Sequence, residues 1–511
     1  MHPDDKRQMA AWMVIISPIL GWFFAVKLNY SLAKPAIKSL WFLVKDTPHR
    51  PVLWLGLLAG LAVGIFMAWL INLSGDGAFG GAKFRRRLRG TVMVEATRLK
   101  RLTTEKKAEQ ISVGGLPMPT KVESLHTLIA GSTGAGKTVL IREMFYTALL
   151  RGDRTIAFDP NGELYSKFGR DGDVLLNPYD ARTKGWSFFN EIRNEYDFKR
   201  YTLSIIPKSK DAGAEEWRGY ARLLFQETAR KLQHIGNPSI QELFRWTTIA
   251  EPKDLKKFLE GTAAESMFVG ADKALASARF VLSEFLPEHL TMPPGTFSLR
   301  KWLENPKGGN LYITWREDQA PALKPLISAW ADVLCTSILS LPESRDRRIW
   351  MFMDELASLY KLPTLMDALT KGRKHGLRIV AGLQTVAQLN LIYGDDEAQA
   401  LRASFRTLAV LGGAHTDPET CEEMSKSLGE HEVERDNFSK SRNSKGTNRT
   451  TSLHTVRERV VMPTEISGLP DLNAYVAFAG NHPIARVAME ILQFKTRLDP
   501  FVERKMATAN A

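Results

Sequence analysis

The sequence predicts an α/β nucleotide-binding domain that contains an all-α insertion and follows a two-helix membrane anchor. Three patterns lead to this prediction: a glycine-rich loop between a strand and a helix, an apolar strand that ends in two acids, and two long apolar stretches near the N-terminus. A chain of 511 residues is expected to form more than one domain. We predict the anchor at 1–75, the nucleotide-binding domain at 76–184 and 299–511, and the all-α domain at 185–298.

Two apolar stretches, 10–26 and 52–71, predict transmembrane helices at about 10–28 and 52–72. The second has 20 residues without a charge, which at about 1.5 Å per residue span a hydrocarbon core of about 30 Å. The first is shorter and contains Pro18, so a cleaved signal peptide is the alternative, although no small-residue cleavage pattern follows. In the second stretch Gly56, Gly60 and Gly64 share one helix face, which favours close helix contact.

The glycine-rich loop lies in residues 126–138, HTLIAGSTGAGKT, and has the form GxxxxGK[ST]. In such a loop successive backbone N–H groups surround phosphate oxygens, and glycines allow the close approach. Lys137 is expected to reach the β- and γ-phosphates, and Thr138 to hold Mg²⁺. The sequence therefore predicts an ATP and Mg²⁺ site. Its binding residues are Gly131, Ser132, Thr133, Gly134, Ala135, Gly136, Lys137, Thr138 and Asp354.

The second strand, residues 349–355, reads IWMFMDE and ends in the two acids. We expect Asp354 to hold the Mg²⁺ through a water molecule and Glu355 to act as general base for the attacking water. The alternative is a buried strand followed by two solvated acids. That alternative is weaker when the acids accompany a phosphate-binding loop.

A third strand, LRIVAGLQ, ends at Gln384, and the segment KGRKHG before it contains Arg373. Ligands of open α/β sheets bind at the carboxyl ends of the strands. Gln384 is therefore a candidate for orienting the lytic water or sensing the γ-phosphate; the alternative is a polar loop residue. Arg373 is a candidate arginine finger for a neighbouring subunit's nucleotide. A basic helix end, favoured by the helix dipole, is nearly as good an interpretation of its spacing.

Lys137 and Asp354 are 217 positions apart, which exceeds a simple nucleotide-binding core, and the part at 185–298 has helical patterns such as ADKALASARFVLSEFL. This part is the predicted all-α insertion. Further along, residues 430–453 are rich in Ser, Asn and Lys, and their polarity predicts a mobile surface loop.

The net charge of +13 does not by itself indicate nucleic-acid binding. Residues 1–100 contain 14 Lys and Arg against 5 Asp and Glu, so nine of the thirteen net charges lie around the predicted anchor. Basic residues that flank membrane helices are expected of any membrane protein. The two cysteines, Cys335 and Cys421, are too few for a disulfide framework or a zinc site, which fits a reducing cytoplasm.

The chain resembles the coupling proteins of conjugative type IV secretion systems. The resemblance covers essentially the whole chain and rests on the anchor followed in order by HTLIAGSTGAGKT, FDPNGELY, WMFMDE, KGRKHGLRIVAGLQ and VVMPTEISGLPDLNAYV. The family belongs to the RecA-like hexameric motors, which implies a RecA-like fold here. By resemblance, its Walker residues and its trans-acting arginine fall on Lys137, Thr138, Asp354, Glu355, Gln384 and Arg373.

The resemblance also implies a function and partners. It implies an inner-membrane ATPase, a ring of six subunits, that captures relaxase-bound single-stranded DNA for export. Expected partners are the relaxase, accessory relaxosome proteins, inner-membrane components of the secretion channel and membrane lipid. ATP places the bulk of a multi-pass chain in the cytoplasm. The sequence shows no base-reading motif, so DNA binding is expected to be independent of sequence.

Two alternatives stay open. One is an FtsK-class double-stranded DNA translocase, for which we expect a larger membrane region and a separate DNA-reading module that this sequence does not show. The other is a docking receptor that uses ATP only for assembly. Stimulation of ATP turnover by DNA separates this receptor from a motor.

Overall fold

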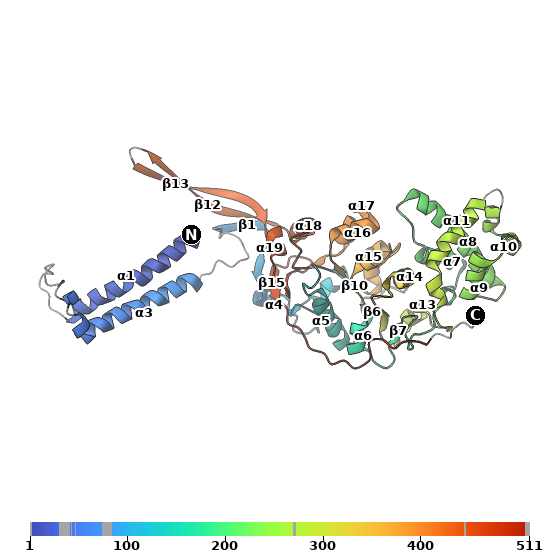
Figure 1. Cartoon of the computed structure of the whole chain (residues 1–511), viewed down its shortest axis with the longest axis horizontal. Coiled ribbons are helices and arrows are strands. Elements are labelled where there is room, and N and C mark those ends of the chain that lie inside the picture. The colour runs from blue at the N-terminus through green and yellow to red at the C-terminus, as the bar shows by residue number, and fades with distance from the viewer. Residues whose placement is uncertain are drawn as a thin grey trace. The chain divides into compact units, whose positions relative to one another are not determined.

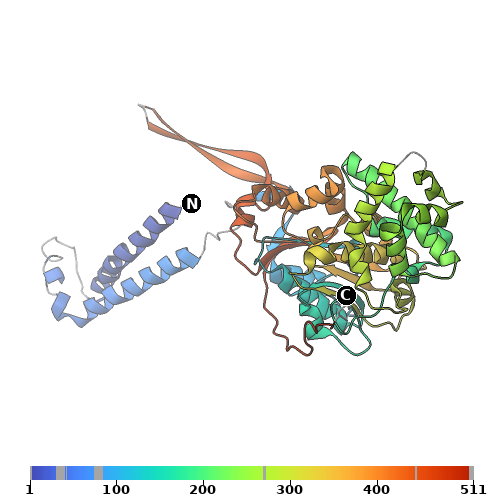
Figure 2. The same ribbon diagram turned by 45° about the vertical axis from the view of Figure 1, so that its right-hand side comes forward.

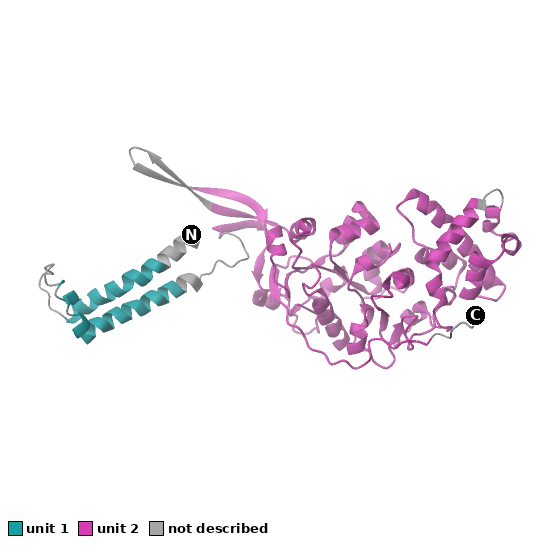
Figure 3. Cartoon of the chain, in the orientation of Figure 1, with its two compact units in different colours: residues 1–83 teal, residues 84–511 magenta. Residues whose placement is uncertain are grey.

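The computed structural model describes residues 3–29, 41, 43–45, 47–73, 84–268, 272–443 and 446–505. The chain divides into two compact units, Met1–Lys83 and Phe84–Ala511 (Figure 3).

The first unit is a pair of long apolar helices, α1 (Pro3–Asn29) and α3 (Pro51–Leu73), with a short 3-10 helix, η1 (Thr47–His49), before α3. Both helices are long and apolar enough to cross a membrane, which agrees with the predicted spans. The expected glycine contact is present, since a Cβ on Gly56 would lie 2.6 Å from the Cβ of Ala25. Gly60 and Gly64 lie as closely against Ser17 of α1.

The second unit is built on a ten-stranded sheet of order β2-β15-β14-β11-β5-β10-β9-β6-β8-β7. From β11 to β7 all neighbouring strands are parallel, whereas β14 pairs antiparallel with both β11 and β15. The strands are β2 (Met93–Glu95), β5 (Thr127–Ala130), β6 (Arg154–Pro160), β7 (Val174–Leu176), β8 (Leu311–Trp315), β9 (Ile349–Met353), β10 (Leu377–Leu383), β11 (Thr407–Leu411), β14 (Asn473–Ala477) and β15 (Ile484–Ala488).

Helices cover both faces of this sheet, as parallel strands buried on both sides require. Figure 1 shows α5 (Lys137–Leu150) and α6 (Glu163–Phe168) on one side. On the other side lie α14 (Ala320–Leu339), α15 (Leu365–Lys371), α16 (Val386–Tyr393) and α17 (Asp395–Ser404). The apolar composition of α14 would also suit a membrane span, but 83% of its apolar window is buried in the protein. This helix is therefore part of the core.

The core between α5 and the sheet is aromatic. The ring of Phe145 lies 5.2 Å from that of Phe352 on β9 and 5.9 Å from that of Tyr312 on β8. All three side chains are buried. Their packing holds α5, and with it the loop before α5, against the strands that carry the acids.

The segment between β7 and β8 is helical, as the sequence predicts, and forms the green lobe in Figure 2. Its longest helices, α8 (Ala212–His234) and α11 (Asp272–Phe285), pack against each other. The other elements are η3 (Phe188–Glu191), α7 (Glu195–Ile205), α9 (Ile240–Phe244), the π-helical η4 (Arg245–Ile249), α10 (Pro252–Phe258), η5 (Ala263–Phe268), α12 (Pro287–Leu290) and α13 (Leu299–Glu304). The boundaries 185 and 298 stay predictions, because this lobe and the sheet lie in one compact unit.

The predicted loop at 430–453 is wrong. The chain there forms β12 (Glu430–Asn443) and β13 (Gly446–Arg459), which pair antiparallel, and β1 (Arg86–Gly90) pairs with the other edge of β12. Opposite charges on neighbouring strands stabilise this pairing where the structure describes the side chains. Examples are Arg89 with Glu432 at 2.7 Å and Arg435 with Glu458 at 2.7 Å.

Short elements complete the unit. They are α4 (Ala96–Thr103), β3 (Ser112–Val113), β4 (Leu116–Pro117), η2 (Thr120–Leu125), η6 (Leu356–Ser358), η7 (Gly372–His375), α18 (Pro418–Leu428) and α19 (Pro463–Ser467).

Candidate nucleotide-binding site

The glycine-rich loop joins the end of β5 to the first turn of α5. Gly134 and Gly136 have φ angles of 83° and 110°, a left-handed conformation that side-chain-bearing residues rarely adopt. The Lys137 ammonium donates hydrogen bonds to the carbonyl oxygens of Gly131 at 2.8 Å and Ser132 at 3.0 Å. The predicted strand, loop and helix are therefore present, with Lys137 turned across the loop.

The two acids follow β9 and lie beside this loop. The Thr138 hydroxyl donates a hydrogen bond of 2.8 Å to Oδ2 of Asp354. The other oxygen of Asp354 is buried and has no hydrogen-bond partner among the described residues. Both carboxylate oxygens of Glu355 are also buried, with only weak contacts to the Gln384 side chain and the Ala357 N–H. Buried carboxylate oxygens without a partner are costly unless a cation or water completes them. The donor set thus fits a hydrated Mg²⁺ between Thr138 and Asp354, with water beside Glu355.

Burial sets the protonation of these groups. It raises the pKa of Asp354, opposed by the hydrogen bond from Thr138 and the charge of Lys137. Burial also raises the pKa of Glu355, again opposed by Lys137. The pKa of Lys137 is lowered by its burial, which the two carboxylates counteract. A raised carboxyl pKa makes Glu355 a stronger proton acceptor than an exposed glutamate, as a general base requires.

Gln384 reaches the same site because β10 lies between β5 and β9 in the sheet. Its side-chain oxygen accepts a hydrogen bond of 3.3 Å from the Thr133 hydroxyl. Both residues line a pocket of 410 Å³ beside the loop. On β10, Gly382 has no side chain, which lets the backbone carbonyl of Asp354 approach that strand closely. Three adjacent strand ends therefore bring together the loop, the acids and the glutamine.

Arg373 does not join this site. It is exposed on η7, which precedes β10, whereas Gln384 follows β10. The seven residues of β10, at about 3.3 Å each, separate the two positions by about 20 Å. Arg373 therefore lies at the opposite edge of the sheet from the loop of its own chain.

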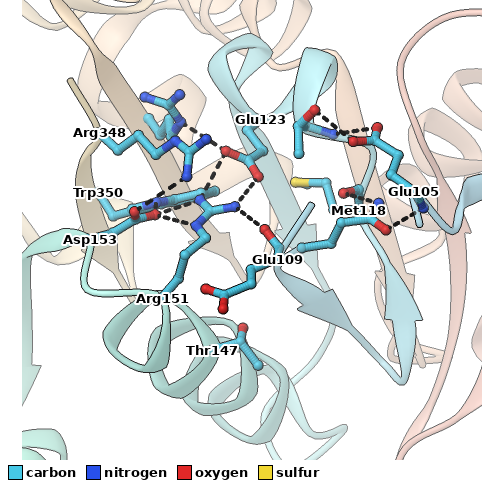
Figure 4. A network of polar contacts seen from close by, with 12 residues as sticks. Glu105, Glu109, Met118, Glu123, Thr147, Arg151, Asp153, Arg348 and Trp350 are labelled. Atoms are coloured by element: carbon cyan, nitrogen blue, oxygen red, sulfur yellow. Dashed lines mark hydrogen bonds and ion pairs between the residues drawn. The ribbon is translucent and has the colours of Figure 1, made fainter. Parts of the chain in front are cut away.

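A buried ion network holds the far end of α5 in place, and no local sequence pattern indicates it (Figure 4). Arg151, just after α5, donates to both carboxylate oxygens of Glu123, at 2.6 and 3.0 Å, and also pairs with Asp153. Glu123 accepts a further hydrogen bond of 3.1 Å from Arg378, and Asp153 one of 2.8 Å from Trp350. These residues are scattered along the chain and form no local motif.

The strand order, the loop and the facing acids define a P-loop nucleotide-binding protein. The family model described as "Type IV secretion-system coupling protein DNA-binding domain" matches residues 110–490, and the chain belongs to this family. The predicted family is thereby confirmed.

Relatives of known sequence include a coupling protein and a conjugal transfer protein. The coupling protein TraD of Escherichia coli (strain K12) is 30% identical over 415 residues, which cover 78% of this chain and 56% of TraD. The conjugal transfer protein TraG of Agrobacterium fabrum is 29% identical over 140 residues, 27% of this chain and 21% of TraG. The chain thus spans about half the length of TraD and less of TraG.

Solved structures confirm the RecA-like α/β fold. The bacterial conjugative coupling protein TrwBdeltaN70 is 63% identical, with a TM-score of 0.79 over 84% of this chain and 99% of that one. The plasmid coupling protein TrwB in complex with ADP and Mg²⁺ is equally similar, with coverage of 84% and 100%.

Proposed function

We propose that this protein is an inner-membrane ATPase that links the relaxosome to a type IV secretion channel and drives export of single-stranded DNA with its relaxase during conjugation. The observation that carries the proposal is the convergence of Lys137, Thr138, Asp354, Glu355 and Gln384 in a member of the coupling-protein family. That convergence supplies the groups which phosphoryl transfer to water requires.

ATP with Mg²⁺ is the proposed ligand. The loop from Gly131 to Gly136 would surround the phosphates, with Lys137 at the β- and γ-phosphates. Thr138 and Asp354 would hold the Mg²⁺, which neutralises phosphate charge when it is bound. The partnerless oxygen of Asp354 and the complex of the related TrwB with ADP and Mg²⁺ support this assignment.

For hydrolysis, Glu355 would take a proton from the attacking water. Its two oxygens are buried with only weak contacts to Gln384 and the Ala357 N–H, and burial raises its pKa. Gln384, at the end of the strand between the loop and the acids, would orient that water. Lys137 would stabilise the charge that develops on the transferred phosphate.

We further propose that subunits assemble head to tail, with Arg373 of one completing the nucleotide site of the next. The placement of Arg373 at the opposite end of β10 from Gln384, about 20 Å away, supports action on a neighbour rather than on its own nucleotide. Head-to-tail contacts close into rings, and the family suggests six subunits.

The other proposed partners follow from the family and the anchor. Single-stranded DNA, the relaxase, accessory relaxosome proteins and channel components would bind the unit that starts at Phe84. The apolar helices α1 and α3 would contact lipid and hold the protein in the inner membrane as a multi-pass anchor.

The test is steady-state ATP turnover by the full chain in detergent, with and without single-stranded DNA, across protein concentration. We expect stimulation by DNA and a steep dependence on concentration. Lys137→Ala should abolish turnover, whereas Lys307→Ala, at an exposed lysine outside the site, should not. Normal turnover by Lys137→Ala would contradict the site. Turnover that DNA and concentration leave unchanged would favour a docking receptor.

A further inference from the structure

Arg345 occupies a position equivalent to that of Arg373 on the neighbouring strand. β9 and β10 are parallel, and Ile349 at the start of β9 pairs with Leu377 at the start of β10. Arg345 precedes Ile349 by four residues, and Arg373 precedes Leu377 by four. The two strands that end at the acids and at Gln384 are thus each preceded by an arginine at the opposite edge of the sheet.

The two arginine-bearing segments are tied together. The Ser344 N–H donates to the carbonyl of Lys374 at 2.9 Å, and the Lys374 ammonium pairs with Glu343 at 2.7 Å. The Arg347 guanidinium donates to the carbonyl of His375 at 3.3 Å. These contacts hold the loop before β9 against η7, so Arg345 and Arg373 are presented from one connected surface.

Together the segments line a pocket of 590 Å³ with an excess of positive charge. Two of its cations have anionic partners, because Lys374 pairs with Glu343 and Arg378 with Glu123. The other three, Arg345, Arg347 and Arg373, form no ion pair with an acid in the part of the chain that the structure describes. The lining residues are Ser124, Glu343, Ser344, Arg345, Arg347, Arg373, Lys374, Gly376 and Arg378.

Those three arginines differ in what they contact. Arg347 donates only to backbone carbonyls, of Pro342 and His375. Arg345 and Arg373 are exposed, and their side chains have no hydrogen bond or ion pair with other described residues. The adjacent Asp346 lines a neighbouring pocket with Arg347 and Arg348, so Arg347 borders both pockets. Three like charges in one pocket repel one another, and an anion with several charges relieves that repulsion.

We propose that Arg345 is a second trans-acting residue, which together with Arg373 binds the phosphates of the nucleotide held by a neighbouring copy of this chain. The inference rests on the proposed head-to-tail assembly. A nucleoside triphosphate has the charge that this pocket lacks, and guanidinium groups bind phosphate oxygens in pairs. The loop, Asp354 and Glu355 lie at one edge of the sheet and the arginines at the other, so stacked copies bring the two edges together.

The experiment mixes full-length variants in detergent and measures ATP turnover. Arg345→Ala alone should lower turnover at least tenfold, whereas Arg316→Ala, a half-exposed arginine outside the pocket, should leave it unchanged. A mixture of Arg345→Ala with Lys137→Ala should recover activity, because a Lys137→Ala neighbour supplies the missing arginine. In random rings of equal parts, about one quarter of the sites have both an intact loop and an arginine donor. The same mixture with Arg373→Ala in place of Arg345→Ala tests the shared site itself.

The outcomes are distinguishable. Recovery in both mixtures supports the proposal, and it also shows that the Arg345→Ala subunits are folded. Recovery with Arg373→Ala but not with Arg345→Ala overturns the role of Arg345 and leaves the shared site standing. Recovery in neither mixture refutes the shared site. Wild-type turnover by Arg345→Ala, or a loss confined to single-stranded DNA binding, would also overturn the proposal; the second result would identify a DNA contact.

Discussion

Acid should destabilise this protein through His126, a buried residue at the start of the loop-bearing strand. Its Nδ1 accepts a hydrogen bond of 2.9 Å from the Ile379 N–H, and its Nε2 lies 2.9 Å from the carbonyl of Leu369. A backbone N–H only donates, so Nδ1 carries no proton and Nε2–H donates to Leu369. The imidazole is therefore neutral in the folded protein, and protonation would break its bond to β10.

The magnitude follows from the pKa. Burial lowers the pKa of His126 to about 4, from 6.5 in an exposed histidine. Between these values the unfolded chain binds a proton that the folded protein does not, so the free energy of unfolding falls as the pH falls. A difference of about 2.5 units at 1.36 kcal/mol each corresponds to about 3 kcal/mol. This contribution is fully present above pH 6.5 and is lost by about pH 4.

The assay is urea unfolding of the full chain in detergent at pH 7 and pH 4, comparing wild type with His126→Asn. Asparagine does not titrate, and the strained backbone at this position (φ 58°, ψ 154°) is common to wild type and variant, so its cost cancels in the comparison of the two pH values. Burial also lowers the pKa of His289 to about 4, but this loss is common to both proteins and cancels in the comparison. Wild type should lose about 3 kcal/mol more than the variant on acidification. Equal losses would refute the reasoning.

Three further predictions concern the ion network, the metal and the anchor. Arg151→Met removes one cation from Asp153, which keeps its contacts with Arg348 and Trp350, and should lower the free energy of unfolding in urea by about 1–3 kcal/mol. A change below about 0.5 kcal/mol would contradict a structural role for the pair. Thr138→Ala removes the hydroxyl bonded to Asp354 and should raise the Mg²⁺ concentration for half-maximal ATP turnover; an unchanged Mg²⁺ dependence would separate Thr138 from the metal. Gly60→Leu should overpack the two apolar helices of the first unit, destabilise their packing by about 1–3 kcal/mol and lower the thermal unfolding temperature in detergent. Leu58→Ala, at an exposed position of the same helix, should leave that temperature unchanged. Equal unfolding temperatures for Gly60→Leu and wild type would contradict the close contact between the helices.

Local pattern was enough for much of the site. A strand, a glycine-rich loop and a helix start are contiguous in the chain, so residues 126–138 specify the phosphate loop without long-range information. The acids at 354 and 355 and the glutamine at 384 were predictable for a related reason, because parallel strands bring their carboxyl ends to one edge. The two anchor helices were predictable from length and hydropathy alone.

Local pattern failed where pairing partners decide the outcome. The polar segment at 430–453 has too little apolar character to predict strands, yet it pairs along β12 and β13 and bonds through charges such as Glu432 with Arg89. The helix α14 is long and apolar enough to cross a membrane, although the sequence analysis placed no span there, and its burial in the core shows that it belongs to the folded unit. Both results depend on residues that are distant in sequence.

The nucleotide loop, its acids, the helical segment and the two helices of membrane-spanning length were predictable from the chain alone, because each depends on residues that are neighbours in sequence. Only the tertiary structure decided that β10 lies between β5 and β9, and hence that Gln384 meets Thr133. It also decided that Arg345 and Arg373 share one pocket, far from their own loop. Strand order and parallel register set these distances, and both arise from contacts between segments that the sequence separates.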